Sequence, residues 1–207
     1  MLTSHSVKEF LEILASKQPA PGGGSISALS GALAAGLVAM VCRFSISSKK
    51  LTDHKEKIEN ILFDVQILKE HLTNLIEEDT EAFNQVMAAF KLPKDDEAQK
   101  THRSQEIQTA YKKAVDIPLL VASKSLEVLK LANTMTNHFN INTASDLGVG
   151  AHCADTGIKG ALLNVDINLL SIKDQSFVER IKLQKTEIIQ ATDQELEIVN
   201  QVVQSNI

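Results

Sequence analysis

Asp79 is an acidic residue at a position where apolar residues are expected, and it is therefore a candidate functional group. It interrupts a row of apolar residues that runs from Ile61 to Phe90 at alternating steps of three and four, the spacing of one helical face. A carboxyl in such a row either pairs with a neighbour and fixes the register of the helix, or acts as a functional group with a shifted pKa. The row alone leaves both explanations open.

Asp146 belongs to a second row, whose members are small or polar. They recur at steps of four, three, four, seven and four and therefore share one helical face: Asp146, Gly150, Cys153, Gly157, Asn164 and Asn168. Such a face leaves space beside the backbone and supplies polar groups to line it. The alternative is tight packing against a neighbouring helix that satisfies the amides.

A glycine run occupies residues 19–25, which read Pro-Ala-Pro-Gly-Gly-Gly-Ser, ahead of a charge-free stretch from Ile26 to Cys42. We expect the free N–H groups of Gly22, Gly23 and Gly24 at a helix start to suit a carboxylate or another electron-rich group, with Ser25 as the N-cap. The run lacks the spacing of a P-loop and follows no strand, so neither a P-loop nor a dinucleotide fingerprint is indicated.

The remaining candidates are amides and cations: Asn142, Asn164, Asn168, Arg43, Lys49 and Lys50. With the two carboxyls and the glycine turn, they predict an enzyme or binder that takes a small anionic molecule and uses acid–base groups. The six histidines include no H-x-x-x-H pair, and no C-x-x-C occurs. We therefore expect neither a metal nor a cofactor.

Composition narrows the class of protein. The 207 residues carry a formal charge of −5, which argues against a nucleic-acid partner or an anionic membrane surface. Two cysteines favour a reducing compartment, and Glu9 and Glu12 interrupt any signal-peptide core, so we expect a cytoplasmic protein. Aromatic residues make up only 4%, which predicts an aliphatic core.

The placement of glycine predicts the fold class. All nine glycines lie in the windows 22–36 and 148–160, and the long intervals without them are rich in helix-forming residues. We expect an all-α protein, one domain over residues 1–207, built as an antiparallel up-and-down bundle of about six helices. The expected helices are residues 1–17, 26–42, 53–90, 97–132 with a kink at Pro118, 143–170 and 175–203.

Residues 26–42 are also a marginal candidate for a membrane span, because they carry no charge. Alanine, glycine and serine dominate this stretch and are weak drivers of insertion. A helix of small residues, apolar on all sides, fits better in the middle of a bundle. We therefore expect no membrane contact.

An ordered set of motifs resembles the cyclodeaminase/cyclohydrolase family, which comprises the C-terminal half of formiminotransferase-cyclodeaminase and free-standing methenyltetrahydrofolate cyclohydrolases. The set begins with the glycine run and continues with Glu78-Asp79, Leu92-Pro93-Lys94 and Ile117-Pro118-Leu119. Asn142 with Ala144-Ser145-Asp146, and residues 160–169 (Gly-Ala-Leu-Leu-Asn-Val-Asp-Ile-Asn-Leu), complete it. The matches span residues 7–175 in order.

The resemblance implies a helical bundle that pairs into a homodimer and acts on a one-carbon unit of tetrahydrofolate. In the cyclodeaminase reaction, a folate nitrogen attacks the 5-formimino carbon, and ammonia leaves to give 5,10-methenyltetrahydrofolate. In the cyclohydrolase reaction, water attacks the methenyl carbon to give 10-formyltetrahydrofolate. We expect the cyclodeaminase, with the cyclohydrolase and a non-catalytic folate-binding module as alternatives.

The resemblance also suggests roles for the candidate residues. Asp146 is the first choice for the general acid/base, and Asp79 the second, as a cation stabiliser or proton relay. The turn from Gly22 to Ser25, with the three asparagines, would position the pterin or the one-carbon unit. The basic residues Lys49, Lys50 and Arg43 would receive the glutamate tail of the folate.

Overall fold

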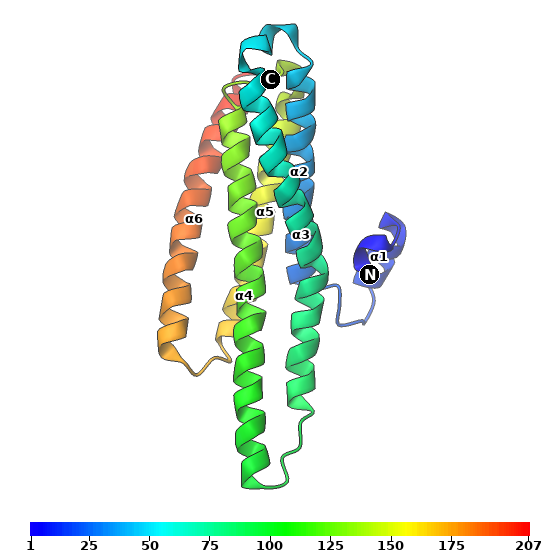
Figure 1. Ribbon diagram of the computed structural model, residues 1–207, viewed down its shortest axis with the longest axis vertical. Coiled ribbons are helices and arrows are strands. Elements are labelled where there is room, and N and C mark those ends of the chain that lie inside the picture. Colours follow the sequence, from blue (N-terminus) through cyan, green and yellow to red (C-terminus); the bar gives the residue numbers. More distant parts are fainter.

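Six α-helices and three short 3-10 turns form the chain in the computed structural model, which describes residues 1–207 and contains no β-strand (Figure 1). The all-α prediction is confirmed. The helices are α1 (Val7–Leu14), α2 (Gly23–Ile46), α3 (Lys55–Phe90), α4 (Glu97–Met135), α5 (Ala144–Leu169) and α6 (Gln175–Gln204). Figure 1 shows α2 to α6 side by side in a bundle, while α1 stands apart next to α3.

Polar side chains cap the first turns of α1, α4 and α6. Ser6 and Glu9 form a complete capping box, so α1 begins at Val7 and is shorter than the predicted 1–17. Asp174 accepts a hydrogen bond from the Phe177 N–H and starts α6 as predicted. Asp96 does the same for α4 with the N–H of Gln99.

Helix α2 is longer at both ends than predicted. Gly22 is its N-cap, and Ser25 lies inside the first turn, so the prediction of Ser25 as N-cap is wrong. The Ser25 hydroxyl is instead directed at another helix, as described below. Nothing after Cys42 stops the helix until Ser47, because neither glycine nor proline occurs there.

Helix α2 packs against α3, α4 and α5 and is the central helix of the bundle. Its length and mean hydropathy of 1.9 are those of a membrane span, but 56% of its most apolar window is buried within the bundle. The contacts explain the small residues, because the α5 backbone approaches α2 closely and side chains of α3 and α4 reach its glycines. A Cβ on Gly157 of α5 would lie 3.0 Å from the N atom of Gly31 and 3.0 Å from the carbonyl oxygen of Ser27.

The core is aliphatic, as the composition predicts. The main cluster of 37 buried residues contains no aromatic side chain and draws on α2 to α6. Helix α4 continues through Pro118 as one helix, and α6 covers the outer side of α4 and α5. The cysteines Cys42 and Cys153 are unpaired.

The close approach of α5 to α2 yields a stability prediction. Gly157→Ala should lower the free energy of unfolding by about 1–3 kcal/mol, because main-chain atoms of α2 cannot move aside for the new methyl group. Gly148→Ala, on the same helix, meets the Val203 side chain at 3.1 Å near the end of α6, where it can shift. Urea unfolding should therefore place Gly148→Ala within about 1 kcal/mol of wild type. Equal losses in both variants would contradict this account.

Candidate functional site

A cavity of about 370 Å³ lies where α2 begins and α5 ends, and α3 and α4 form its other walls. That volume is in the range of small-molecule sites. Figure 1 shows α3 and α4 extending beyond the start of α2 at this end of the bundle. Six of the predicted site residues line the cavity: Gly22, Gly23, Gly24, Asp79, Asn164 and Asn168.

Asp79 lies against the first turn of α2. The Ser25 hydroxyl donates a hydrogen bond of 2.9 Å to Oδ2 of Asp79, and Thr80 Oγ1 lies 3.4 Å from the same hydroxyl. A Cβ on Gly24 would overlap the Asp79 carboxyl, so only glycine allows this approach. The third glycine of the run therefore makes room for a carboxyl from α3.

Burial raises the pKa of Asp79, and hydrogen bonding from Ser25 opposes that rise. Asp79 is the only charged side chain among the residues that line the cavity. The sequence predicted an anionic ligand, but a cavity with one carboxylate and no cation suits a cationic group. The anionic ligand of the sequence analysis stays a prediction, since this cavity brings no basic side chain to it. The positive end of the α2 dipole acts on the carboxyl itself.

The two asparagines turn their nitrogen atoms toward main-chain carbonyls. Nδ2 of Asn164 donates to the carbonyl oxygen of Gly160 at 2.9 Å, one turn earlier in α5. Nδ2 of Asn168 donates to the carbonyl oxygen of Ala114, in α4, at 2.8 Å. Each amide oxygen thereby remains without a hydrogen-bond donor from the chain, on a residue that lines the cavity.

An apolar and aromatic wall faces these polar groups, and the sequence analysis did not identify it as part of a site. Phe83 and Phe90 come from α3, and Tyr111 of α4 meets the Phe90 ring edge-on with 6.1 Å between ring centres. A flat heterocycle can pack on such a wall. Phe83 and Phe90 follow Asp79 by four and eleven positions, so their shared helical face was the available signal.

Five predicted site residues lie at the opposite end of the bundle: Arg43, Lys49, Lys50, Asn142 and Asp146. Asp146 is in the first turn of α5 and Asn164 near its end, so the helical rise separates them by about 27 Å. One chain therefore does not bring Asp146, the first choice for the acid/base group, to the cavity that contains Asp79. The steps along α5 predicted the shared face correctly, but a shared face says nothing about height along the helix.

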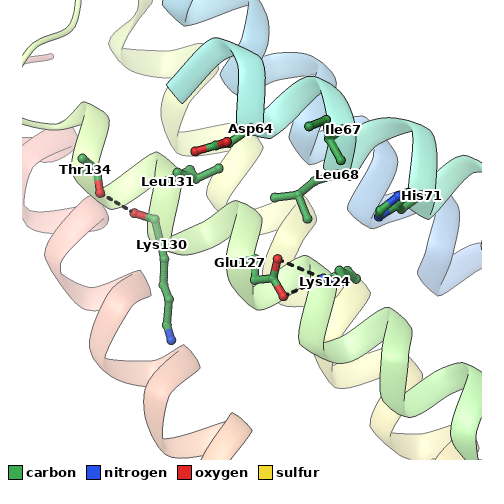
Figure 2. A pocket seen from close by; sticks show the side chains of 9 residues that line it. All are labelled: Asp64, Ile67, Leu68, His71, Lys124, Glu127, Lys130, Leu131 and Thr134. Atoms are coloured by element: carbon green, nitrogen blue, oxygen red, sulfur yellow. Dashed lines mark hydrogen bonds and ion pairs between the residues drawn. The ribbon is translucent and has the colours of Figure 1, made fainter. Parts of the chain in front are cut away.

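A second cavity of similar volume lies between α3 and α4, away from the glycine run (Figure 2). Its walls carry charged groups of both signs, among them Asp64, Lys124, Glu127 and Lys130. Figure 2 shows Lys124 paired with Glu127 of its own helix, at 2.9 Å. None of the predicted site residues lines this groove. The carboxyl, amides and glycines converge only at the first cavity.

No group of three or more His, Cys, Asp or Glu side chains is placed to hold a metal ion. The expectation of chemistry without a metal or cofactor stays a prediction. The residues present at the cavity are an acid, two amides, hydroxyls and aromatic rings, which can bind a heterocycle and move a proton.

The raised pKa of Asp79 yields a second prediction. The folded state holds this proton more tightly than the unfolded chain, so the stability of the wild type falls as pH rises through that pKa. Asn at position 79 cannot ionise, so Asp79→Asn avoids this loss of stability. At pH 7 the Tm of the variant should therefore exceed that of the wild type. The gain should shrink as the pH is lowered. Asp64→Asn, an exposed aspartate on the same helix, is the control and should show no comparable gain. A lower Tm for Asp79→Asn at pH 7 would contradict the burial argument.

Comparison with known proteins gives consistent matches over almost the whole chain. The family model described as Formiminotransferase-cyclodeaminase matches residues 6–187. A methenyltetrahydrofolate cyclohydrolase of Methylorubrum extorquens is 38% identical over 86% of this chain and 86% of its own length. A formimidoyltransferase-cyclodeaminase of Dictyostelium discoideum is 36% identical over 98% of this chain, which covers only 37% of that longer protein.

A solved structure agrees with the fold as well. The crystal structure of a formiminotetrahydrofolate cyclodeaminase from Thermotoga maritima superposes with a TM-score of 0.90 and 27% sequence identity. The superposition covers 99% of this chain and 98% of that chain, so the two share the bundle and their length. The family resemblance inferred from the motifs is confirmed. This chain belongs to the formiminotransferase-cyclodeaminase family of folate one-carbon enzymes.

Proposed function

We propose that this chain is a formiminotetrahydrofolate cyclodeaminase, which converts 5-formiminotetrahydrofolate to 5,10-methenyltetrahydrofolate and ammonia. The observation that carries the proposal is the lone carboxyl of Asp79, buried beside the α2 start in a cavity without any cation. A protonated formimino group is an amidinium cation with N–H donors. It therefore matches both the charge of this cavity and its free acceptor oxygens.

The reaction needs a proton to be moved, and Asp79 is the only titratable carboxyl at the cavity. The N10 nitrogen of the folate attacks the formimino carbon, and its proton must reach the departing amine before ammonia can leave. The Asp79 carboxylate would take the proton from N10 and give it to the amine, ending in its starting state. The nucleophile belongs to the substrate, so the cavity walls supply the remaining rate through positioning.

The second candidate is methenyltetrahydrofolate cyclohydrolase. It is supported by the Methylorubrum extorquens relative, which bears that name and matches along most of its length. The same carboxylate would remove a proton from water as it attacks the methenyl carbon, and it would stabilise the cationic substrate. Both reactions place a cation beside Asp79, so one cavity suits either.

Absorbance assays on the purified protein distinguish the two activities. With 5-formiminotetrahydrofolate, the cyclodeaminase should produce the methenyl chromophore; with 5,10-methenyltetrahydrofolate, a cyclohydrolase should remove it faster than the spontaneous rate. Asp79→Asn should lower the active turnover at least about a hundredfold, whereas Asp64→Asn should not. The carboxylate form is required, so activity should fall as pH drops through the raised pKa of Asp79.

The outcomes separate the candidates. Folded protein without turnover of either compound would favour the non-catalytic folate-binding module. Turnover by Asp79→Asn at the wild-type rate would remove Asp79 from proton transfer. A hundredfold loss in Asp146→Asn would mean that Asp146 reaches the cavity from a second chain, because one chain keeps the two apart.

We also propose that the protein is a cytoplasmic homodimer that pairs along α2. The outer face of α2 is apolar, with Leu33 and Phe44 each 53% exposed, and it continues onto α5 at Val149 and Leu163. Helix α1 adds an apolar edge, none of whose residues is fully buried in its own chain. An antiparallel pairing would carry the basic end of one chain, including Lys49 and Lys50, toward the other chain's cavity. There these lysines could receive the glutamate tail.

Leu33→Asp tests this pairing. A carboxylate at the middle of the interface should raise the dimer dissociation constant at least about tenfold, since it would be buried without a partner. Leu183→Asp is the control, because Leu183 is an exposed leucine on α6, away from α2. Light scattering after size-exclusion chromatography gives the molecular mass of the wild type and of both variants. A wild-type monomer, or dissociation in the control alone, would contradict the proposed interface.

A further inference from the structure

Pro118 creates a local defect in α4 directly behind the cavity. In a regular helix, the carbonyl of Ala114 would accept the N–H of residue 118, but proline has no N–H. The proline ring also clashes with the carbonyl four residues earlier and tilts it away from the helix axis. Both residues are buried in the bundle, where polar main-chain groups are normally hydrogen-bonded. The Ala114 carbonyl needs a donor from elsewhere.

Asn168 of α5 supplies this donor. Its Nδ2 lies 2.8 Å from the Ala114 carbonyl oxygen, and both residues line the cavity. Only the nitrogen side of an amide can donate, so this contact decides which way the amide is turned. The oxygen of Asn168 must therefore be the atom left for a ligand. A leucine at this position could neither satisfy the carbonyl nor present an acceptor.

We propose that Pro118 is a positioning residue that acts through Asn168: the carbonyl it frees locks the Asn168 amide with its oxygen toward the cavity, as a fixed acceptor for the N–H groups of the one-carbon unit. This inference rests on the proposed function for the identity of that unit. The geometry of the lock, from Pro118 to Ala114 to Asn168, does not depend on it.

A locked acceptor distinguishes between the two candidate substrates. The amidinium of 5-formiminotetrahydrofolate carries N–H groups that an amide oxygen can accept. The methenyl carbon of 5,10-methenyltetrahydrofolate carries no N–H, although the compound is also a cation. A freely turning amide could present its own NH₂ group instead, which would repel an N–H donor. Fixing the amide therefore favours the formimino compound.

A double-mutant cycle tests the lock. Pro118→Ala supplies the missing main-chain N–H and leaves Asn168 in place, while Asn168→Leu removes the acceptor. Pro118→Ala should raise KM for the formimino compound about fivefold, the factor that corresponds to about 1 kcal/mol. If the protein binds one of the two compounds without converting it, the inhibition constant Ki of that compound against the other is measured in place of KM. The KM or Ki of the methenyl compound should change less than about twofold in Pro118→Ala. In the Asn168→Leu background, Pro118→Ala should have no further effect on either constant.

Either of two kinetic results would overturn the inference. A merely structural role for Pro118 would change both compounds alike and would persist in the Asn168→Leu background. Equal losses for both compounds in Asn168→Leu would assign the acceptor to the shared ring system and not to the one-carbon unit. Pro93→Ala, in the exposed connection between α3 and α4, controls for the removal of a proline and should change neither value.

The side-chain amide signal of Asn168 tests the same lock without any turnover. In ¹⁵N-labelled protein, the pair of Asn168 N–H signals is identified by its loss in Asn168→Leu. One proton of the pair should resonate downfield and exchange slowly in the wild type, and should lose both properties in Pro118→Ala. If neither folate is converted but the signal behaves in this way, the proposed function fails while the lock stands. An unchanged signal in Pro118→Ala overturns the lock, whatever the enzyme does.

Discussion

The contact between the first turn of α2 and Asp79 of α3 is the constraint on which the candidate site depends. It requires a helix start without side chains, because a single methyl group on Gly24 would occupy the place of the carboxyl. It also requires that α2 be held deep in the bundle, which the small residues facing α5 allow. The same composition that made residues 26–42 look like a membrane span thus serves close packing.

That contact places a carboxyl where burial makes its charged form unfavourable, with the Ser25 hydroxyl as its one side-chain donor within 3 Å. A protein under no functional demand would place an asparagine or an aliphatic residue there, since either avoids the cost of burying a charge. A bound cation would change that balance, because it would add to the favourable field of the α2 N-terminus at the carboxylate. The raised pKa of Asp79 and the absence of other charged side chains along the cavity are therefore parts of one arrangement.

The sequence predicted the helices well because helix formation is governed by local signals. The placement of glycine marked the long helical intervals, and the expected starts at residues 97 and 175 are those of α4 and α6, whereas the first helix begins six residues later than expected. The N-cap of α2 was predicted wrongly because serine is a common cap, whereas here its hydroxyl is engaged by a residue 54 positions away. A contact of that range leaves no trace in local spacing.

The candidate site was predicted only in part for a related reason. Periodicity assigns a residue to a face of its helix but gives no height, so the row on α5 joined Asp146 to Asn164 although they lie at opposite ends. Height follows from how the helices are paired and where each begins, which are properties of the whole bundle. The residues at the start of α2 and the end of α5 meet because those helices run antiparallel, as the contact of Gly23 with Asn164 records. For a chain of this kind, a functional residue is therefore best assigned by combining its face with its distance from the nearest turn.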